Sequence, residues 1–214
     1  MNGKSISDFK KVAMNNNSLS KRTLVFGKGV NDAWYKTHLN VNGKGLHCPV
    51  YSAWIRMLRR SYDPKFHEKE PTYANVEVCD DWLKFSNYAK WHEKNYIDGF
   101  QLDKDLKVKG NKEYNPLCCM YVPKCLNNLI IDSGASRGEY PEGVHLRKNT
   151  KGGVNRYYAQ ISSDGKRVHV GSFLSVDLAF TAYKKAKNKE ILKKCEQYPE
   201  FAVYLKNHLY DMEC

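Results

Sequence analysis

Residues 143–186 constrain the fold more than any other part of this chain, because strand, turn and helix signals follow one another there without conflict. Three segments of alternating character predict short strands, which are separated by the turn-rich residues 148–155 and by Asp164-Gly165. Ser175 then stands at the N-cap position of a helix whose small and aromatic residues recur at helical spacing, at Ala179, Ala182, Tyr183 and Ala186. The pattern predicts a three-stranded antiparallel sheet packed on one helix.

The period of two along these strands divides their side chains between two faces. The face expected to cover the helix consists of Val144, Leu146, Tyr157, Ala159, Ile161, Val168 and Val170. The opposite face carries hydrogen-bonding and basic side chains, namely His145, Arg147, Arg156, Tyr158, Gln160, Ser162, Arg167 and His169. Because arginine can address guanine and glutamine can address adenine in the major groove, this second face predicts a surface that binds duplex DNA. An ordinary solvated face is the alternative.

This module resembles the AP2/ERF DNA-binding domain. The resemblance rests on Gly143-Val144, Tyr157–Ile161, Arg167–Phe173 and Ala179 with Ala182-Tyr183. That family binds DNA through its sheet, and the resemblance implies groove and phosphate contacts for His145, Arg147, Gln160, Ser162, Arg167 and His169. Several of these positions are Arg or Trp in plant members of the family but His, Gln or Ser here. The resemblance therefore implies DNA binding without implying a target sequence.

Charge and composition favour an anionic partner. The 214 residues include 35 Lys and Arg against 23 Asp and Glu, a net charge of +12, and such an excess binds polyanions through counterion release. The chain has no run of 18 apolar residues and its N-terminus has no signal-peptide pattern, so we expect an intracellular protein without a membrane partner. Seven cysteines without a CxxC pair favour reduced thiols over a disulfide framework or a zinc finger.

Changes in periodicity divide the rest of the chain. Residues 1–48 are rich in Asn, Ser, Lys and Gly and predict an irregular N-terminal arm. Residues 49–131 predict a helix over Pro49–Leu58, a strand over Val76–Cys79 and a second helix with an aromatic stripe, and we expect Trp54, Trp82 and Trp91 to be structural. A linker over 132–140, the sheet module over 141–194 and a C-terminal helix within 195–214 complete an α+β protein.

A second candidate site lies in residues 99–131. Gln101–Leu106 and Cys118–Val122 predict two strands, and Pro123 predicts the first residue of a helix that contains Asn127. In this ββα unit we expect Asp103 and Asn127 to converge, with Asp105 joining Asp103 on the same face of the strand. Oxygen ligands that leave positions open for water suit Mg²⁺, which is the expected cofactor if the protein is an enzyme.

The ββα unit resembles HNH endonucleases, and more closely the phage-type homing nucleases that pair such a unit with an AP2-like domain. Residues Tyr51–Tyr62 and Val78–Trp82 also look like that group. The resemblance implies metal-dependent cleavage of duplex DNA, with Asp103 and Asn127 as metal ligands. It further implies a phage-encoded protein in the cytoplasm of the host cell.

Two positions depart from the HNH pattern. Lys104 stands where the general-base histidine is expected, and Cys118 stands where the structural asparagine is usual. As an ammonium, Lys104 could grip a phosphate, but it could act as a base only with a strongly lowered pKa. His67 and His92 are the nearest substitutes for the base, although no pattern puts them beside Asp103.

The sequence therefore leaves two classes of function open. One is a metal-dependent endonuclease of the homing type, with Asp103, Lys104 and Asn127 in its catalytic site. The other is a catalytically inactive DNA-binding or regulatory protein, including a phage protein that interferes with its host by occupying DNA or a protein partner. RNA binding is a third alternative, but a sheet with one exposed tyrosine and many hydrogen-bonding side chains suits duplex grooves better than stacking on single strands.

Overall fold

The computed structural model describes residues 6–131, 138–148 and 153–212 and combines helices with small sheets, so the α+β prediction is confirmed. Contacts divide the chain into two compact units. The first consists of residues 1–98 and 112–118, and the second consists of residues 99–111 and 119–214. Residues 49–131, which the sequence analysis treats as one region, are thus shared between the two units.

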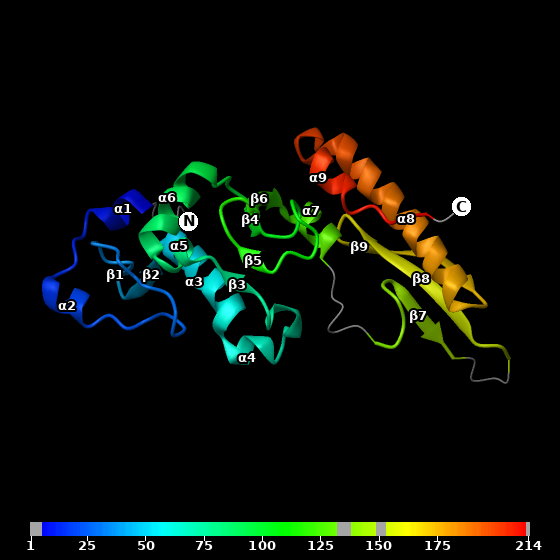
Figure 1. The fold of residues 1–214 in the computed structure, drawn as a ribbon, viewed down its shortest axis with the longest axis horizontal. Helices are drawn as coiled ribbons and strands as arrows, with labels where there is room; N and C mark the ends of the chain where they lie inside the picture. Colours follow the sequence, from blue (N-terminus) through cyan, green and yellow to red (C-terminus); the bar gives the residue numbers. More distant parts are fainter. Residues whose placement is uncertain (1–5, 132–137, 149–152, 213–214) are drawn as a thin grey trace. The chain divides into compact units, whose positions relative to one another are not determined.

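The first unit is mainly helical and carries two small two-stranded sheets. Its helices are α1 (Ile6–Lys10), α2 (Asn16–Ser20), α3 (Pro49–Tyr62), α4 (Pro64–His67), the 3₁₀ helix η1 (Pro71–Tyr73), α5 (Asp80–Leu83) and α6 (Phe85–Asn95). Its strands are the antiparallel pair β1 (His38–Val41) and β2 (Lys44–His47) and the parallel pair β3 (Glu77–Val78) and β5 (Glu113–Tyr114). Figure 1 labels the α-helices and strands of this unit along the chain.

Aromatic side chains form the core of the first unit. Trp54 on α3 and Trp82 on α5 are almost wholly buried, and the indole N–H of Trp54 donates to the carbonyl of Trp82 at 2.7 Å. Trp91 is half-buried against Trp82, with ring centroids 4.6 Å apart. The prediction that these tryptophans are structural is confirmed. Helix α3 runs one turn beyond the predicted Leu58, because the breaker Pro64 comes only after Tyr62.

The N-terminal range is less irregular than the sequence suggests. Helices α1 and α2 and the β1–β2 hairpin fall within residues 1–48, and Phe9 and Tyr35 are buried there. The hairpin turn consists of Asn42 and Gly43, with φ of +53° and +76°, a pair of left-handed residues that matches the twist of the flanking strands. Asparagine and glycine, which made this range look irregular, are the residues that such a turn requires.

The second unit contains the predicted sheet and the ββα unit. Its strands are β4 (Phe100–Asp103), β6 (Met120–Pro123), β7 (Val144–Arg147), β8 (Arg156–Ser163) and β9 (Lys166–Phe173). Its helices are α7 (Lys124–Ile130), α8 (Val176–Gln197), the 3₁₀ helix η3 (Pro199–Phe201) and α9 (Ala202–Lys206). Of the predicted linker, residues 132–137 lie outside the described residues, as do residues 149–152 of the turn between β7 and β8.

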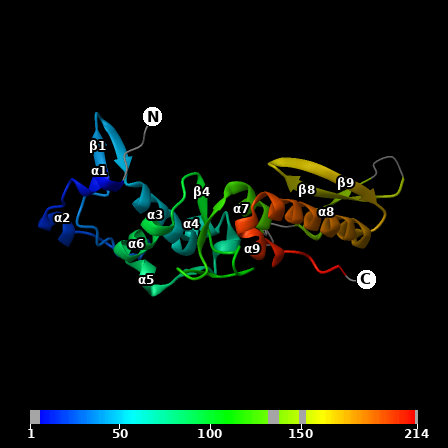
Figure 2. The same ribbon diagram turned by 90° about the horizontal axis from the view of Figure 1, so that it is seen from above.

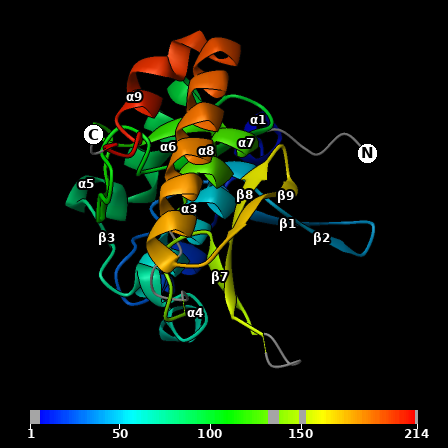
Figure 3. The same ribbon diagram turned by 90° about the vertical axis from the view of Figure 1, so that its right-hand side faces the viewer.

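The antiparallel order β7-β8-β9 and the helix behind it match the prediction from the sequence. Asp164 and Gly165 form the tight turn between β8 and β9, both with positive φ, and Ser175 caps α8 by accepting the N–H of Leu178 at 3.2 Å. Figure 3 shows α8 running across one face of this sheet. The helix continues to Gln197, beyond the predicted end of the module at residue 194.

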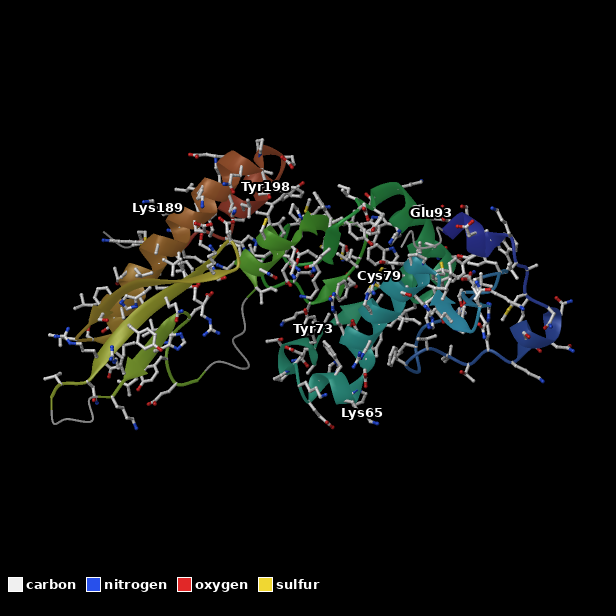
Figure 4. All side chains as sticks on the ribbon, turned by 180° about the vertical axis from the view of Figure 1, so that it is seen from behind. Lys65, Tyr73, Cys79, Glu93, Lys189 and Tyr198 are labelled. Atoms are coloured by element: carbon white, nitrogen blue, oxygen red, sulfur yellow. The ribbon has the colours of Figure 1, made fainter. Side chains whose placement is uncertain are left out.

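Helix α8 serves two hydrophobic clusters in the second unit. Near its start, Ala179 and Tyr183 pack with Val144 and Ala159 of the sheet. The second cluster joins the end of α8 to the ββα unit and α9, and it consists of Leu106, Val122, Leu126, Leu129, Ile191, Cys195, Phe201 and Leu205. Tyr198, which follows α8 and is labelled in Figure 4, accepts a hydrogen bond from the thiol of Cys125 on α7 at 3.4 Å. Figure 2 shows α7, α8 and α9 from above. One helix therefore supports both the sheet and the ββα unit.

Strand β9 departs from strict alternation. Ala159 pairs with Gly171 but Gln160 pairs with His169, so Val170 is the extra residue of a β-bulge. The bulge reverses the faces beyond it, and Phe173 consequently packs in the core with Tyr157 opposite. Val168, which was expected against the helix, is 43% exposed.

The ββα unit is shorter than predicted. Strand β4 ends at Asp103 instead of Leu106, because Asp103 opens a hydrogen-bonded turn. Strand β6 begins at Met120, and Pro123 is the N-cap of α7 instead of its first helical residue. In the sequence between these two strands, Glu113 and Tyr114 form β5, which belongs to the first unit and pairs there with β3. The sequence pattern did not predict this pairing.

Candidate nucleic-acid interface

The outer face of the β7-β8-β9 sheet brings together all eight side chains predicted to bind DNA. Direct cross-strand pairs join His145 to Tyr158, Arg147 to Arg156, Gln160 to His169 and Ser162 to Arg167. Alternate residues of β8 connect these pairs, so the eight side chains project to one side of the sheet. Helix α8 packs on the other side, which leaves this outer face open within the unit.

Tyr158 forms the centre of the outer face. Its ring stacks on the imidazole of His145, with centroids 5.1 Å apart and an angle of 26° between the planes, and it lies 6.2 Å from the ring of His169. Cross-strand aromatic contacts of this kind stabilise a sheet and limit the motion of its side chains. Tyr158 is half-buried, whereas both histidines are exposed.

The charge on the outer face has one sign. The eight side chains include three arginines and no carboxylate, and Arg147 and Arg156 lie directly opposite each other. Like charges at opposite positions of a sheet are unfavourable, by up to roughly 1 kcal/mol. A ligand with two or more anionic groups would relieve this repulsion.

Sequence reasoning missed one member of this surface. Ser172 pairs with Tyr158, which puts it on the outer face, and its hydroxyl lies 3.5 Å from Nε2 of His169. Strict alternation from His169 would turn Ser172 toward the helix. Gly171 is the only local signal for the bulge, because a glycine inside a strand often marks one.

An ion-pair cluster fixes the tip of the β8–β9 hairpin to α8. The carboxylate of Asp164 accepts from Lys194 at 2.5 Å and from Lys193 at 3.3 Å. Hydrogen bonds from Lys194 and Lys193 lower the pKa of Asp164. The side chain of Lys194 is almost fully buried and also donates to Gln197 at 2.8 Å. These contacts hold the two longest strands of the interface against the helix.

In the ββα unit, Lys104 is part of the structure of a loop. Its ammonium donates to both carboxylate oxygens of Asp105 at 2.8 Å and to the carbonyl of Asn111 at 2.6 Å. The side-chain amide of Asn111 returns a hydrogen bond to the carbonyl of Lys104 at 2.9 Å. The ammonium is thus saturated by three oxygen acceptors, and its side chain is only 8% exposed.

Asp103 organises the same loop. Its Oδ1 accepts the backbone N–H groups of Asp105 at 2.9 Å and Leu106 at 2.6 Å. This turn directs Leu106 into the core, where its side chain is fully buried. Burial raises the pKa of Asp103, although the hydrogen bond from the N–H of Leu106 opposes the shift.

The three side chains predicted to bind a metal each have another partner in this structure. Asn127 donates to the side chain of Gln101 at 2.9 Å, and Asp103 is bound to its own turn. Asp105 does not continue the strand but pairs with Lys104, and a divalent cation bound there would face that ammonium. In the described part of the chain, no group of three or more His, Cys, Asp or Glu side chains is arranged to hold a metal.

The two histidines considered as substitute bases belong to the first unit. His92 is buried on α6, where burial lowers its pKa to about 4. Nε2 of His67 lies 2.8 Å from the carbonyl of Arg60. Both side chains are therefore held within the packing of that unit.

Comparison with protein-family models, with curated proteins and with solved structures found no match to this chain. Among the helices formed by the described residues, none combines the length and apolarity needed to cross a membrane.

Proposed function

We propose that this protein binds duplex DNA through the outer face of the β7-β8-β9 sheet. The observation that carries the proposal is the composition of this face, which combines arginine, histidine, glutamine, serine and tyrosine side chains without a carboxylate. Arginines suit phosphates and guanine edges, and Gln160 suits an adenine edge. The net charge of +12 supports a polyanionic partner.

The surroundings of Lys104 favour binding without cleavage. A general base must be able to accept a proton, whereas Lys104 donates from a saturated ammonium to Asp105 and Asn111. Asp103 supports the adjoining turn, so the loop has a structural role that needs no reaction. The ββα unit then acts as a scaffold that packs against α8 through Leu126 and Ile191.

Salt-titrated binding of a labelled DNA duplex, followed by fluorescence anisotropy, tests the proposed interface. The triple variant Arg147→Ala/Arg156→Ala/Arg167→Ala removes three positive charges from the outer face. If all three contact phosphates, the slope of log K against log salt falls in magnitude by about 2.7, because each phosphate contact on B-DNA contributes roughly 0.9.

A matched control separates this surface from the overall charge. Lys185, Lys189 and Lys206 are exposed on α8 and α9, away from the outer face, and Lys189 is labelled in Figure 4. The triple substitution of these lysines by alanine gives the same net charge, and we expect it to leave most of the slope intact. Equal losses in the two triple variants would contradict the proposed interface. Preferential competition by single-stranded RNA would favour the RNA alternative.

Supercoiled-plasmid cleavage tests the endonuclease alternative on the same preparations. We expect the wild type to bind the plasmid in a salt-sensitive manner without nicking it in Mg²⁺ or Mn²⁺. Metal-dependent nicking that disappears in Asp103→Ala and in EDTA would instead identify the ββα unit as a catalyst.

A further inference from the structure

The β1–β2 hairpin carries two histidines at directly opposite positions, His38 on β1 and His47 on β2. The next pair toward the rest of the unit is Thr37 with Cys48, where the N–H of Cys48 donates to the carbonyl of Thr37 at 2.9 Å. Because hydrogen-bonded and non-hydrogen-bonded pairs alternate along an antiparallel ladder, His38 and His47 form a non-hydrogen-bonded pair. Side chains approach each other most closely at such pairs.

The two imidazoles are close enough to share one ion. Their ring centroids are 4.6 Å apart, and the rings are inclined at 44°. Two nitrogens that bind the same tetrahedral Zn²⁺ at 2.0–2.1 Å lie about 3.3 Å from each other. Small rotations of rings at this separation bring one nitrogen of each to that distance.

The surroundings of the pair keep it accessible. Both histidines are exposed, and among the interactions of the described residues neither imidazole has a hydrogen bond or an ion pair. A Cβ atom at Gly45 would lie 2.7 Å from Nε2 of His38, so the absence of a side chain at Gly45 leaves room for this ring. Figures 2 and 3 both show the hairpin extending away from helix α3.

We propose that His38 and His47 form a binding site for a divalent transition metal, with Zn²⁺ as the reference ion. Neutral imidazole is a good ligand for Zn²⁺, Cu²⁺ and Ni²⁺ but a poor one for Mg²⁺ and Ca²⁺. Two protein ligands leave further coordination positions for water or an external donor. The bound ion also cross-links β1 to β2 and so stabilises the hairpin, since it binds the folded geometry better than the unfolded chain.

The test is a titration of the full-length protein with Zn²⁺, monitored by long-range ¹H–¹⁵N NMR of the histidine side chains. We expect the signals of His38 and His47 to shift together. In His47→Gln, the apparent affinity at His38 falls by at least about tenfold, since even second-shell changes around metal ligands cost that much. His38→Gln has the converse effect on His47.

Two further variants sharpen the result. His145→Gln removes an exposed histidine of the second unit, and we expect it to leave the response of the hairpin unchanged. Gly45→Ala puts a methyl group against His38, and we expect weaker Zn²⁺ binding with both ligands still present. A response of His38 that survives in His47→Gln, or Zn²⁺ effects confined to other histidines and cysteines, would overturn the proposal. The NMR titration and its variants do not depend on DNA binding.

Discussion

Replacing Gly143 by alanine is expected to destabilise the second unit severely. Gly143 has φ of +71°, and an added Cβ would lie 2.1 and 2.2 Å from two ring carbons of Tyr183 and 2.7 Å from the carbonyl oxygen of Gln160. The backbone has little freedom to move away, because the carbonyl of Gly143 accepts the N–H of Gln160 at 2.8 Å. Tyr183 is buried in the cluster between α8 and the sheet and cannot yield without opening it.

The size of the effect follows from two separate costs. A left-handed conformation costs an alanine roughly 1–2 kcal/mol relative to glycine, and overpacking of a filled core costs roughly 1–3 kcal/mol more. We therefore expect Gly143→Ala to lower the free energy of unfolding by roughly 2–5 kcal/mol.

Gly165→Ala supplies the comparison for this prediction. Gly165 has φ of +77°, but no atom lies within 4 Å of the added Cβ, so this variant has only the backbone cost. Urea unfolding followed by far-UV circular dichroism gives the free energies of unfolding of both variants and the wild type. If Gly143→Ala costs no more than Gly165→Ala, the close contact of Gly143 with Tyr183 is not a determinant of the fold, and the reasoning fails.

Three further predictions concern charged and titratable side chains. Lys104→Met should lower the free energy of unfolding, measured by urea titration, by roughly 1–3 kcal/mol. The reason is that the half-exposed carboxylate of Asp105 and the carbonyl of Asn111 lose their donor. An unchanged free energy of unfolding would contradict the structural role of Lys104. His92 has a pKa of about 4 in the folded chain and roughly 6.5 in the unfolded chain. The free energy of unfolding should therefore fall by up to roughly 3 kcal/mol as the pH drops from 6.5 to 4. His92→Gln should flatten this pH dependence when unfolding is measured across the same range. Because the pKa of Asp164 is lowered, its bond to Lys194 stabilises the fold at pH values above the usual pKa of a carboxyl, and this stabilisation is lost as the pH falls through the lowered pKa. Asp164→Asn should therefore reduce the melting temperature at pH 7, and the reduction should become smaller as the pH is lowered.

The sheet module was predictable because its signals are local. The turn at Asp164-Gly165, the cap at Ser175 and the alternation along β8 each specify backbone geometry within a few residues. The bulge at Val170 could not be predicted with the same certainty, because it depends on packing Phe173 against residues distant in the sequence. Alternation alone gives the wrong face for Ser172 for that reason.

The candidate metal site shows a second reason why residue spacing alone does not predict how side chains meet. The sequence positions of Asp103, Asp105 and Asn127 are compatible with convergence, but in the structure Asp103 and Asn127 are hydrogen-bonded to other groups. Asp103 meets the N–H of Leu106 because the buried position of Leu106 requires a sharp turn there. A prediction from residue spacing that treats Gln101–Leu106 as a continuous strand does not include this turn.

The hydrogen bonds of Lys104 give it a structural role in its loop. An imidazole near neutral pH offers one donor and one acceptor, whereas an ammonium offers three donors, and Lys104 uses them on two carboxylate oxygens and one carbonyl. The loop it closes holds Leu106 in the cluster that also contains Ile191 of α8. The same helix supports the sheet through Ala179 and is tied to its hairpin through Lys194. A ββα unit stabilised in this way keeps the sheet and its helix in place, and that is the contribution it would make to the proposed DNA binding.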